Sequence, residues 1–172
     1  MEFYEVVRRR LSVRSYKSDP VPEEVLNRIL EAGRLAPSAK NLQPWKFIVI
    51  KDQDIRQKLV SACHEQKFVA EAPVAICVCE VESEAWGGMG GYWGAGPVDV
   101  TIALEHMILA AAAEGLGTCW IGAFVEADVR KVLEIPEGVK PIALTPLGYA
   151  AREFKPRPRK PLADIVCYDK FV

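Results

Sequence analysis

Arginines and a hydroxyl are concentrated near the N-terminus, in the segment Arg8-Arg-Arg-Leu-Ser-Val-Arg14. Arginine forks donate charge-assisted hydrogen bonds to phosphate oxygens, and the hydroxyl of Ser12 can add a further donor. The same arginines could instead complement the negative end of the helix expected over residues 2–10. Composition leaves both interpretations open: an anion-binding site, or a charged helix end.

A second basic cluster, Lys155-Pro-Arg-Pro-Arg-Lys-Pro161, lies near the other end of the chain. Three prolines fix the backbone and donate no hydrogen bonds, so we expect an extended arm and no helix here. Such an arm could bind nucleic acid. The chain as a whole is balanced, however, with 22 Lys+Arg against 23 Asp+Glu, and the cluster has no interleaved aromatic residues. We therefore expect no nucleic-acid partner.

The segment Ala36-Pro-Ser-Ala-Lys-Asn-Leu-Gln-Pro-Trp45 connects an expected helix to an expected strand. Small and amide residues between two prolines favour a tight loop with exposed backbone and side-chain donors. The segment is either a ligand-binding loop or an ordinary connection, and the residues alone do not choose between the two.

Several common catalytic motifs are absent from the sequence, including G-x-S-x-G, the phosphate loop G-x-x-x-x-G-K-[ST] and the dinucleotide fingerprint G-x-G-x-x-G. The two histidines, His64 and His106, form no H-E-x-x-H, and Cys63, His64, Cys77 and Cys79 lack the usual zinc-ligand spacing. We expect no metal site and nominate no side chain as catalytic acid, base or nucleophile. If the protein is an enzyme, a bound cofactor supplies the reactivity.

Hydrophobic patterning predicts the elements that position these groups. A length of 172 residues indicates one domain. Alternating helices and strands indicate a sheet core covered by helices. The expected helices span residues 2–10, 22 to before 37, 52–63, 97–116 and about 126–133; the expected strands span 47–50, 73–79, 118–121 and 142–145.

The helix expected over residues 97–116 is apolar on every side in its second half. Such a helix must be enclosed, and a two-fold interface between copies of the chain would enclose it. The longest apolar run, Met107–Ala113, is much shorter than the ~20 residues that span a bilayer. Residues 1–20 show no signal peptide. We therefore expect a cytoplasmic protein with no membrane partner.

Four segments, in this order, resemble the FMN-dependent nitroreductase family: R-x-S-x-R at 10–14, A-P-S-x-x-N-x-Q-P-W at 36–45, G-L-G-T-C-W-I-G at 115–122 and the basic arm at 155–161. The second segment is the specific one. The resemblance spans almost the whole chain and implies one FMN-binding domain over residues 1–172. It also implies an α+β fold with three α/β/α layers and a mixed, mainly antiparallel sheet, in an intertwined homodimer with two FMN sites at the interface.

Carried over residue by residue, the resemblance places Arg10 and Ser12 on the flavin phosphate and ribityl chain, and Arg14 near the pyrimidine edge. Arg157 and Arg159 would reach the phosphate from the C-terminal arm. The other subunit would contribute ring contacts from Pro37, Ser38, Ala39 and Asn41, and the backbone of Ile121, Gly122 and Ala123 would approach flavin N5.

The implied activity is an FMN-dependent oxidoreductase. NADH or NADPH would give hydride to the flavin in one half-reaction, and a small acceptor (a nitroaromatic, quinone or flavin) would take two electrons in the other. Two departures put the acceptor in doubt: the chain is short between Val81 and Pro97, and Gly122 stands where some members carry an acidic residue. The alternatives are a non-catalytic FMN store or sensor, and a specialised branch such as a reductive dehalogenase.

Overall fold

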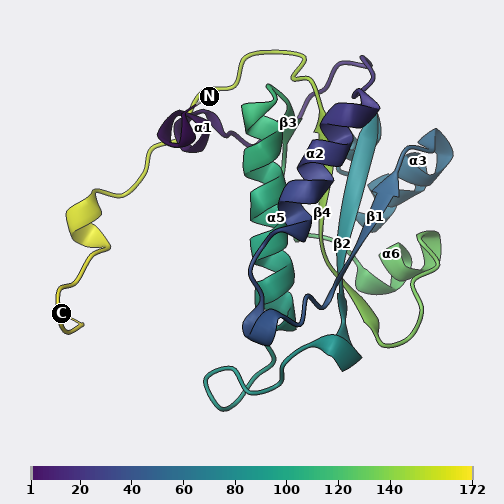
Figure 1. The fold of residues 1–172 in the computed structure, drawn as a ribbon. Helices are drawn as coiled ribbons and strands as arrows, with labels where there is room; N and C mark the ends of the chain where they lie inside the picture. Colours follow the sequence, from purple (N-terminus) through teal and green to yellow (C-terminus); the bar gives the residue numbers. More distant parts are fainter. Residues whose placement is uncertain (1, 172) are drawn as a thin grey trace.

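The computed structural model describes residues 2–171. Its centre is a four-stranded sheet in the order β1-β2-β4-β3, in which every neighbouring pair is antiparallel (Figure 1). The strands are β1 (Trp45–Ile50), β2 (Val74–Val81), β3 (Gly117–Thr118) and β4 (Val139–Gly148).

Helices cover both faces of this sheet, which confirms the expected three-layer α+β architecture (Figure 1). On one face lie α2 (Glu23–Arg34) and α5 (Gly96–Ala113). On the other lie α3 (Gln53–Ala62), the short α4 (Phe68–Glu71) and α6 (Glu126–Val132). The N-terminal α1 (Phe3–Arg9) contacts α5, and the 3₁₀ turns are η1 (Ala39–Asn41), η2 (Glu82–Glu84) and η3 (Leu162–Asp164).

The central strand β2 divides its side chains between the two layers because successive residues of a strand point to opposite faces. Val74, Ile76 and Val78 pack in the cluster that includes α2 and α5. Ala75, Cys77 and Cys79 pack in the cluster that includes α3 and α6. Both faces are buried, as the wholly apolar run 73–79 predicts.

The core helix α5 is apolar enough and long enough to pass a length-and-composition test for a membrane span, and among residues 2–171 it is alone in doing so. Its place in the fold accounts for that composition, because it packs on α2 and on the sheet. Contact with α2 is close at Gly33, where an added Cβ would lie 2.2 Å from Met107 Cε.

Three elements differ from expectation by three residues at an end. Strand β4 spans Val139–Gly148 and so extends the expected 142–145 at both ends. Helix α5 ends at Ala113, before 116, because Gly115 adopts a left-handed φ of 77° and its N–H and that of Leu116 bond back to the last turn. The strand expected over 118–121 is paired only at Gly117–Thr118, with an isolated bridge at Ile121, because the Cys119 N–H donates to the Thr145 hydroxyl at 3.2 Å. Helix α4 and turn η1 were not predicted.

Candidate functional site

The basic N-terminal segment runs along the β3 side of the sheet. Arg10 caps the C-terminus of α1 and leaves the helical conformation with a ψ of 121°. Ser12 then forms a parallel bridge with Thr118. The Val13 N–H donates to the Thr118 carbonyl at 2.8 Å, and the Lys17 N–H donates to the Tyr149 carbonyl at 2.9 Å. These bonds fix the backbone on which Arg10, Ser12 and Arg14 are carried.

The C-terminal arm leaves the body beside this same segment. Ala150 bridges to Tyr16, and the Ala151 N–H donates to the Ser15 carbonyl at 3.0 Å. From there the chain passes near α1 and away from the sheet (Figure 1). The two basic clusters, far apart in sequence, therefore start from one edge of the fold.

Both clusters face one cavity of about 340 Å³. Four arginines, a lysine and a hydroxyl contribute to its lining, and none of the carboxylates in the described residues 2–171 does. The lining residues are Arg10, Leu11, Ser12, Arg14, Phe154, Lys155, Arg157 and Arg159. A cavity with this donor set and no acid is suited to a phosphate-sized anion. The structure thus brings together the five basic-cluster residues that the resemblance assigns to cofactor binding.

A smaller neighbouring cavity of about 120 Å³ shares Arg10 and Ser12 and extends to Thr118 and Trp120. Glu105 of α5 also lines it. Partial burial raises the pKa of Glu105, opposed by the positive charges of Arg10 and His106. The sequence motifs do not indicate Glu105 or Trp120 as lining residues, although Trp120 belongs to the G-L-G-T-C-W-I-G segment.

The thiol of Cys119 is close to this basic wall but buried. Burial raises its pKa, while Arg14 and the Ser12 side chain act in the opposite direction. A buried thiol that keeps its proton is a poor nucleophile, so Cys119 acts as a packing residue.

Residues 121–123 come directly after Trp120, which lines the smaller cavity. Ile121 is buried and exchanges two backbone hydrogen bonds with Leu144, at 2.8 and 3.0 Å. Gly122 and Ala123 are exposed, and Gln66 Nε2 donates to the Ala123 carbonyl at 3.1 Å. The sheet therefore holds Ile121 firmly and leaves the next two residues open to a ligand.

The loop that carries Pro37, Ser38, Ala39 and Asn41 lies elsewhere. Its Ala39 N–H donates to Asp99 Oδ1, in the first turn of α5, at 3.0 Å. The cavities reach α5 at Glu105 and Ile108, about two helical turns further along. A single copy of the chain does not bring this loop to the basic cavity.

Comparison with known proteins identifies the family. The sequence profile described as the nitroreductase family matches residues 7–73 and 61–149. A putative NADH dehydrogenase/NAD(P)H nitroreductase of Methanothermobacter thermautotrophicus is 36% identical over 155 residues, which cover 88% of this chain and 78% of that protein. The chain belongs to the nitroreductase family.

Solved structures agree with this assignment. A nitroreductase family protein of Clostridium difficile 630 superposes with a TM-score of 0.90 at 30% identity, covering 99% of this chain and all of the other. An FMN-dependent nitroreductase of Clostridium difficile R20291 has a TM-score of 0.84 at 27% identity, covering 96% and 98% of the two chains. The α+β fold expected from the resemblance is confirmed.

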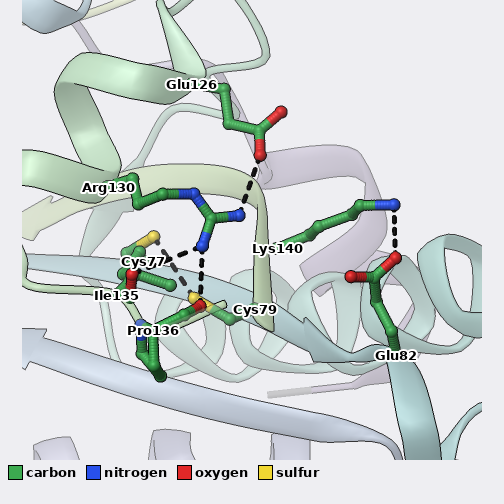
Figure 2. Close-up of polar contacts among 8 residues, drawn as sticks. All are labelled: Cys77, Cys79, Glu82, Glu126, Arg130, Ile135, Pro136 and Lys140. Atoms are coloured by element: carbon green, nitrogen blue, oxygen red, sulfur yellow. Dashed lines mark hydrogen bonds and ion pairs between the residues drawn. The ribbon is translucent and has the colours of Figure 1, made fainter. Parts of the chain in front are cut away.

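The cysteines of this nitroreductase-family chain do not form a metal centre in the described residues, where no group of three or more His, Cys, Asp or Glu could hold an ion. Cys77 and Cys79 lie side by side on β2 with their sulfurs 3.8 Å apart, below Arg130 (Figure 2). Their hydrogen bond lowers the pKa of Cys79 and, with burial, raises that of Cys77. Arg130 pairs with Glu126 at 3.0 Å and donates to the Pro136 carbonyl at 2.7 Å (Figure 2). The two cysteines are buried in the core, whereas Arg130 is half-buried and Glu126 and Pro136 are exposed.

Proposed function

We propose that this chain is an FMN-dependent NAD(P)H oxidoreductase that passes two electrons to a small organic acceptor. One observation carries the proposal: arginines from the two ends of the chain meet at one cavity with Ser12 and no carboxylate. Without an anion those guanidinium groups repel one another, so the cavity favours a phosphate-bearing ligand. The names of the related proteins, FMN-dependent nitroreductase and NAD(P)H nitroreductase, supply the cofactor and the electron donor.

In this proposal the side chains of the protein bind and orient the FMN. Arg10, Ser12, Arg157 and Arg159 donate to the phosphate, and Arg14 places a positive charge toward the flavin pyrimidine edge. FMN, when bound, supplies the hydride exchange, so that NAD(P)H, a proton and the acceptor give NAD(P)⁺ and the two-electron-reduced acceptor. Gly122 has no side chain to obstruct close approach of a ligand to the backbone.

The working unit of this proposal is an intertwined homodimer. The loop at residues 37–41 stays away from the basic cavity in one copy, so the partner's loop completes the site. The C-terminal segment also carries large apolar side chains without cover, namely Leu162, Ile165, Tyr168 and Phe171, which are 61–96% exposed. A second subunit would bury them.

A cytoplasmic location belongs to the same proposal. Cys63, Cys77, Cys79 and Cys119 are buried and form no disulfide, which suits a reducing compartment.

The decisive experiment is anaerobic stopped-flow mixing of the FMN-loaded protein with NADH and, separately, NADPH. We expect the flavin absorbance to bleach within seconds with at least one donor, and to return on addition of a quinone, a nitroaromatic or free flavin. A protein that binds FMN but stays oxidised with both donors is a flavin store or sensor, and the proposal fails. Reoxidation by a halogenated aromatic with release of halide, and by none of the other acceptors, would indicate the reductive dehalogenase alternative.

A further inference from the structure

The loop Ser38–Gln43 has an unfavourable backbone. Lys40, Asn41 and Gln43 have φ angles of 52°, 57° and 53°, in the left-handed region. The left-handed region is energetically unfavourable for residues other than glycine. Three such residues within four positions therefore make the loop conformation costly in free energy. A loop of this kind keeps its shape only if surrounding contacts determine it.

Most of the contacts that shape the loop are internal. The Gln43 N–H donates to Ser38 Oγ at 2.9 Å, and Gln43 Nε2 donates to the Asn41 carbonyl at 3.0 Å. Among residues 2–171, the hydrogen bond that ties this loop to a residue distant in sequence runs from the Ala39 N–H to Asp99 Oδ1. The Lys40 ammonium also lies 5.3 Å from the ring centroid of Trp86.

Asp99 is itself unusual, because it is a carboxylate with only 4% of its surface exposed. Its second oxygen, Oδ2, is buried and has no hydrogen-bond partner within the part of the chain that the structure describes. Unsatisfied buried polar atoms are rare and destabilising, so each requires an explanation. The acidic neighbour Glu80 does not supply a favourable charge, since the negative charge of Asp99 raises the Glu80 pKa, after the larger effect of burial.

We propose that Asp99 is a positioning residue: its carboxylate holds the Ala39 N–H and thereby keeps the strained Ser38–Gln43 loop in the shape that contacts the flavin of the partner subunit. The inference rests on the proposed function, which assigns Ser38, Ala39 and Asn41 to the ring system. A charged acceptor binds an N–H more strongly than a neutral one, which explains why a carboxylate is kept in a buried place.

A simpler alternative is that Asp99 only stabilises α5. An acidic residue in the first turn of a helix stabilises it through the helix dipole. In that role Asp99 would stabilise α5 and would not determine the shape of the Ser38–Gln43 loop. The two roles separate by substitution. Asp99→Asn retains the Oδ1 acceptor and loses the charge, whereas Asp99→Ala loses both, so only the positioning role predicts that Asn rescues the loop.

The experiment measures amide hydrogen exchange in peptides covering residues 36–44 of the full-length, FMN-loaded protein. We expect exchange about tenfold faster or more in Asp99→Ala and within about threefold of wild type in Asp99→Asn. The matched control is Met107→Ala, which destabilises the same helix from the core and should not change this peptide selectively. If Asp99→Ala does not fold, Ala39→Pro removes the donor instead, because the extended Ser38 before it accepts a following proline.

Flavin affinity and acceptor kinetics complete the test. Asp99→Ala should weaken FMN binding or raise the acceptor KM about tenfold, and Asp99→Asn should restore most of the loss. Unchanged exchange in both Asp99→Ala and Ala39→Pro overturns the proposal, whatever the activity. Faster exchange with wild-type FMN affinity and KM also overturns it, because the loop would then lie outside the site, while the flavin function would stand.

Discussion

At the scale of single residues, the N-terminal arginines divide by what their side chains face. Arg9 lies in the last turn of α1, where a cation complements the helix dipole, and pairs with Glu5 one turn away at 2.8 Å. Arg10 and Arg14 line the basic cavity. The fold thus separates members of one cluster that composition could not distinguish, and the anion-binding role of Arg10 and Arg14 stays a proposal.

The phosphate role of the arm can be tested at Arg159. Its guanidinium donates to the Arg157 carbonyl at 3.3 Å, a neutral acceptor that a phosphate would displace. Hydrogen bonds to charged groups contribute roughly 1.5–3 kcal/mol, or about one to two decades in affinity. Arg159→Ala should weaken FMN by that factor and leave riboflavin, which lacks the phosphate, nearly unchanged, as measured by fluorescence titration.

The control is Lys160→Ala, the next basic residue of the arm, which does not line the cavity. It should keep the full preference for FMN over riboflavin. If Arg159→Ala also keeps that preference, Arg159 does not contact the phosphate.

Glu80 gives a residue-scale prediction on stability. Burial, and then the charges of Glu82 and Asp99, raise the pKa of its carboxyl, while Lys140 acts to lower it. The folded state therefore binds this proton more tightly than the unfolded state, and stability falls as pH rises from the ordinary glutamate pKa, ~4.3, through the raised value. Glu80→Gln removes this loss, so its stability advantage should be absent near pH 4 and grow toward pH 7.

Urea unfolding at fixed protein concentration measures this difference across the pH range. Glu84→Gln, an exposed carboxylate on η2, is the control and should show little pH-dependent advantage. A constant difference between Glu80→Gln and wild type at all pH values would show that ionisation of Glu80 is not linked to folding.

At the scale of elements, hydrophobic periodicity predicted the helices and strands other than α4. It did not predict the element ends that are set by hydrogen bonds to side chains. The apolar run at 73–79 identified the buried strand β2, because a strand covered on both faces has no polar side. The run at 47–50 also identified a strand, but β1 lies at the edge of the sheet and its residues 47–49 are only half-buried. The observed strand β3 is shorter than the one expected over 118–121. The backbone N–H of Cys119 donates to the hydroxyl of Thr145, a residue 26 positions away in the sequence, instead of to a backbone carbonyl of the neighbouring strand. No local pattern carries that information.

The close contact between β3 and the Arg10–Arg14 segment makes Gly117 a sensitive position. A Cβ at Gly117 would lie 2.6 Å from Val13 Cγ2 and 2.8 Å from its Cβ. Val13 is β-branched and cannot rotate away freely, so the backbone carrying Ser12 must move. Gly117→Ala should lower the free energy of unfolding by about 1–3 kcal/mol and weaken FMN binding.

Thermal unfolding and FMN titration measure the two effects. Gly94→Ala is the matched control, because the nearest atom to its added Cβ, the Trp86 carbonyl oxygen, is 4.0 Å away. It should leave both quantities nearly unchanged. Normal stability and affinity in Gly117→Ala would mean that Val13 adapts without moving the cavity.

At the scale of the whole molecule, the candidate site was predictable only in part. The pairing of Arg10 and Ser12 with Arg157 and Arg159 came from the family resemblance, because composition shows two basic clusters and not their proximity. The lining by Glu105 and Trp120, and the tie between Ala39 and Asp99, depend on how α5 packs, and no sequence spacing encodes them. In one copy the loop at residues 37–41 also lies away from the basic cavity, so the site as proposed needs a second subunit.

Dimerisation is therefore the prediction on which the whole site depends. The C-terminal segment extends away from the body (Figure 1). It exposes apolar side chains that a partner would cover. Sedimentation at micromolar protein should give about twice 19.1 kDa. Deleting residues 162–172 retains Arg157 and Arg159 but removes those side chains, so it should shift the equilibrium toward monomer and weaken FMN binding in parallel. Replacing only the exposed Lys170 by alanine should change neither property. A full-length monomer that holds FMN at wild-type affinity would show that each copy builds its site alone.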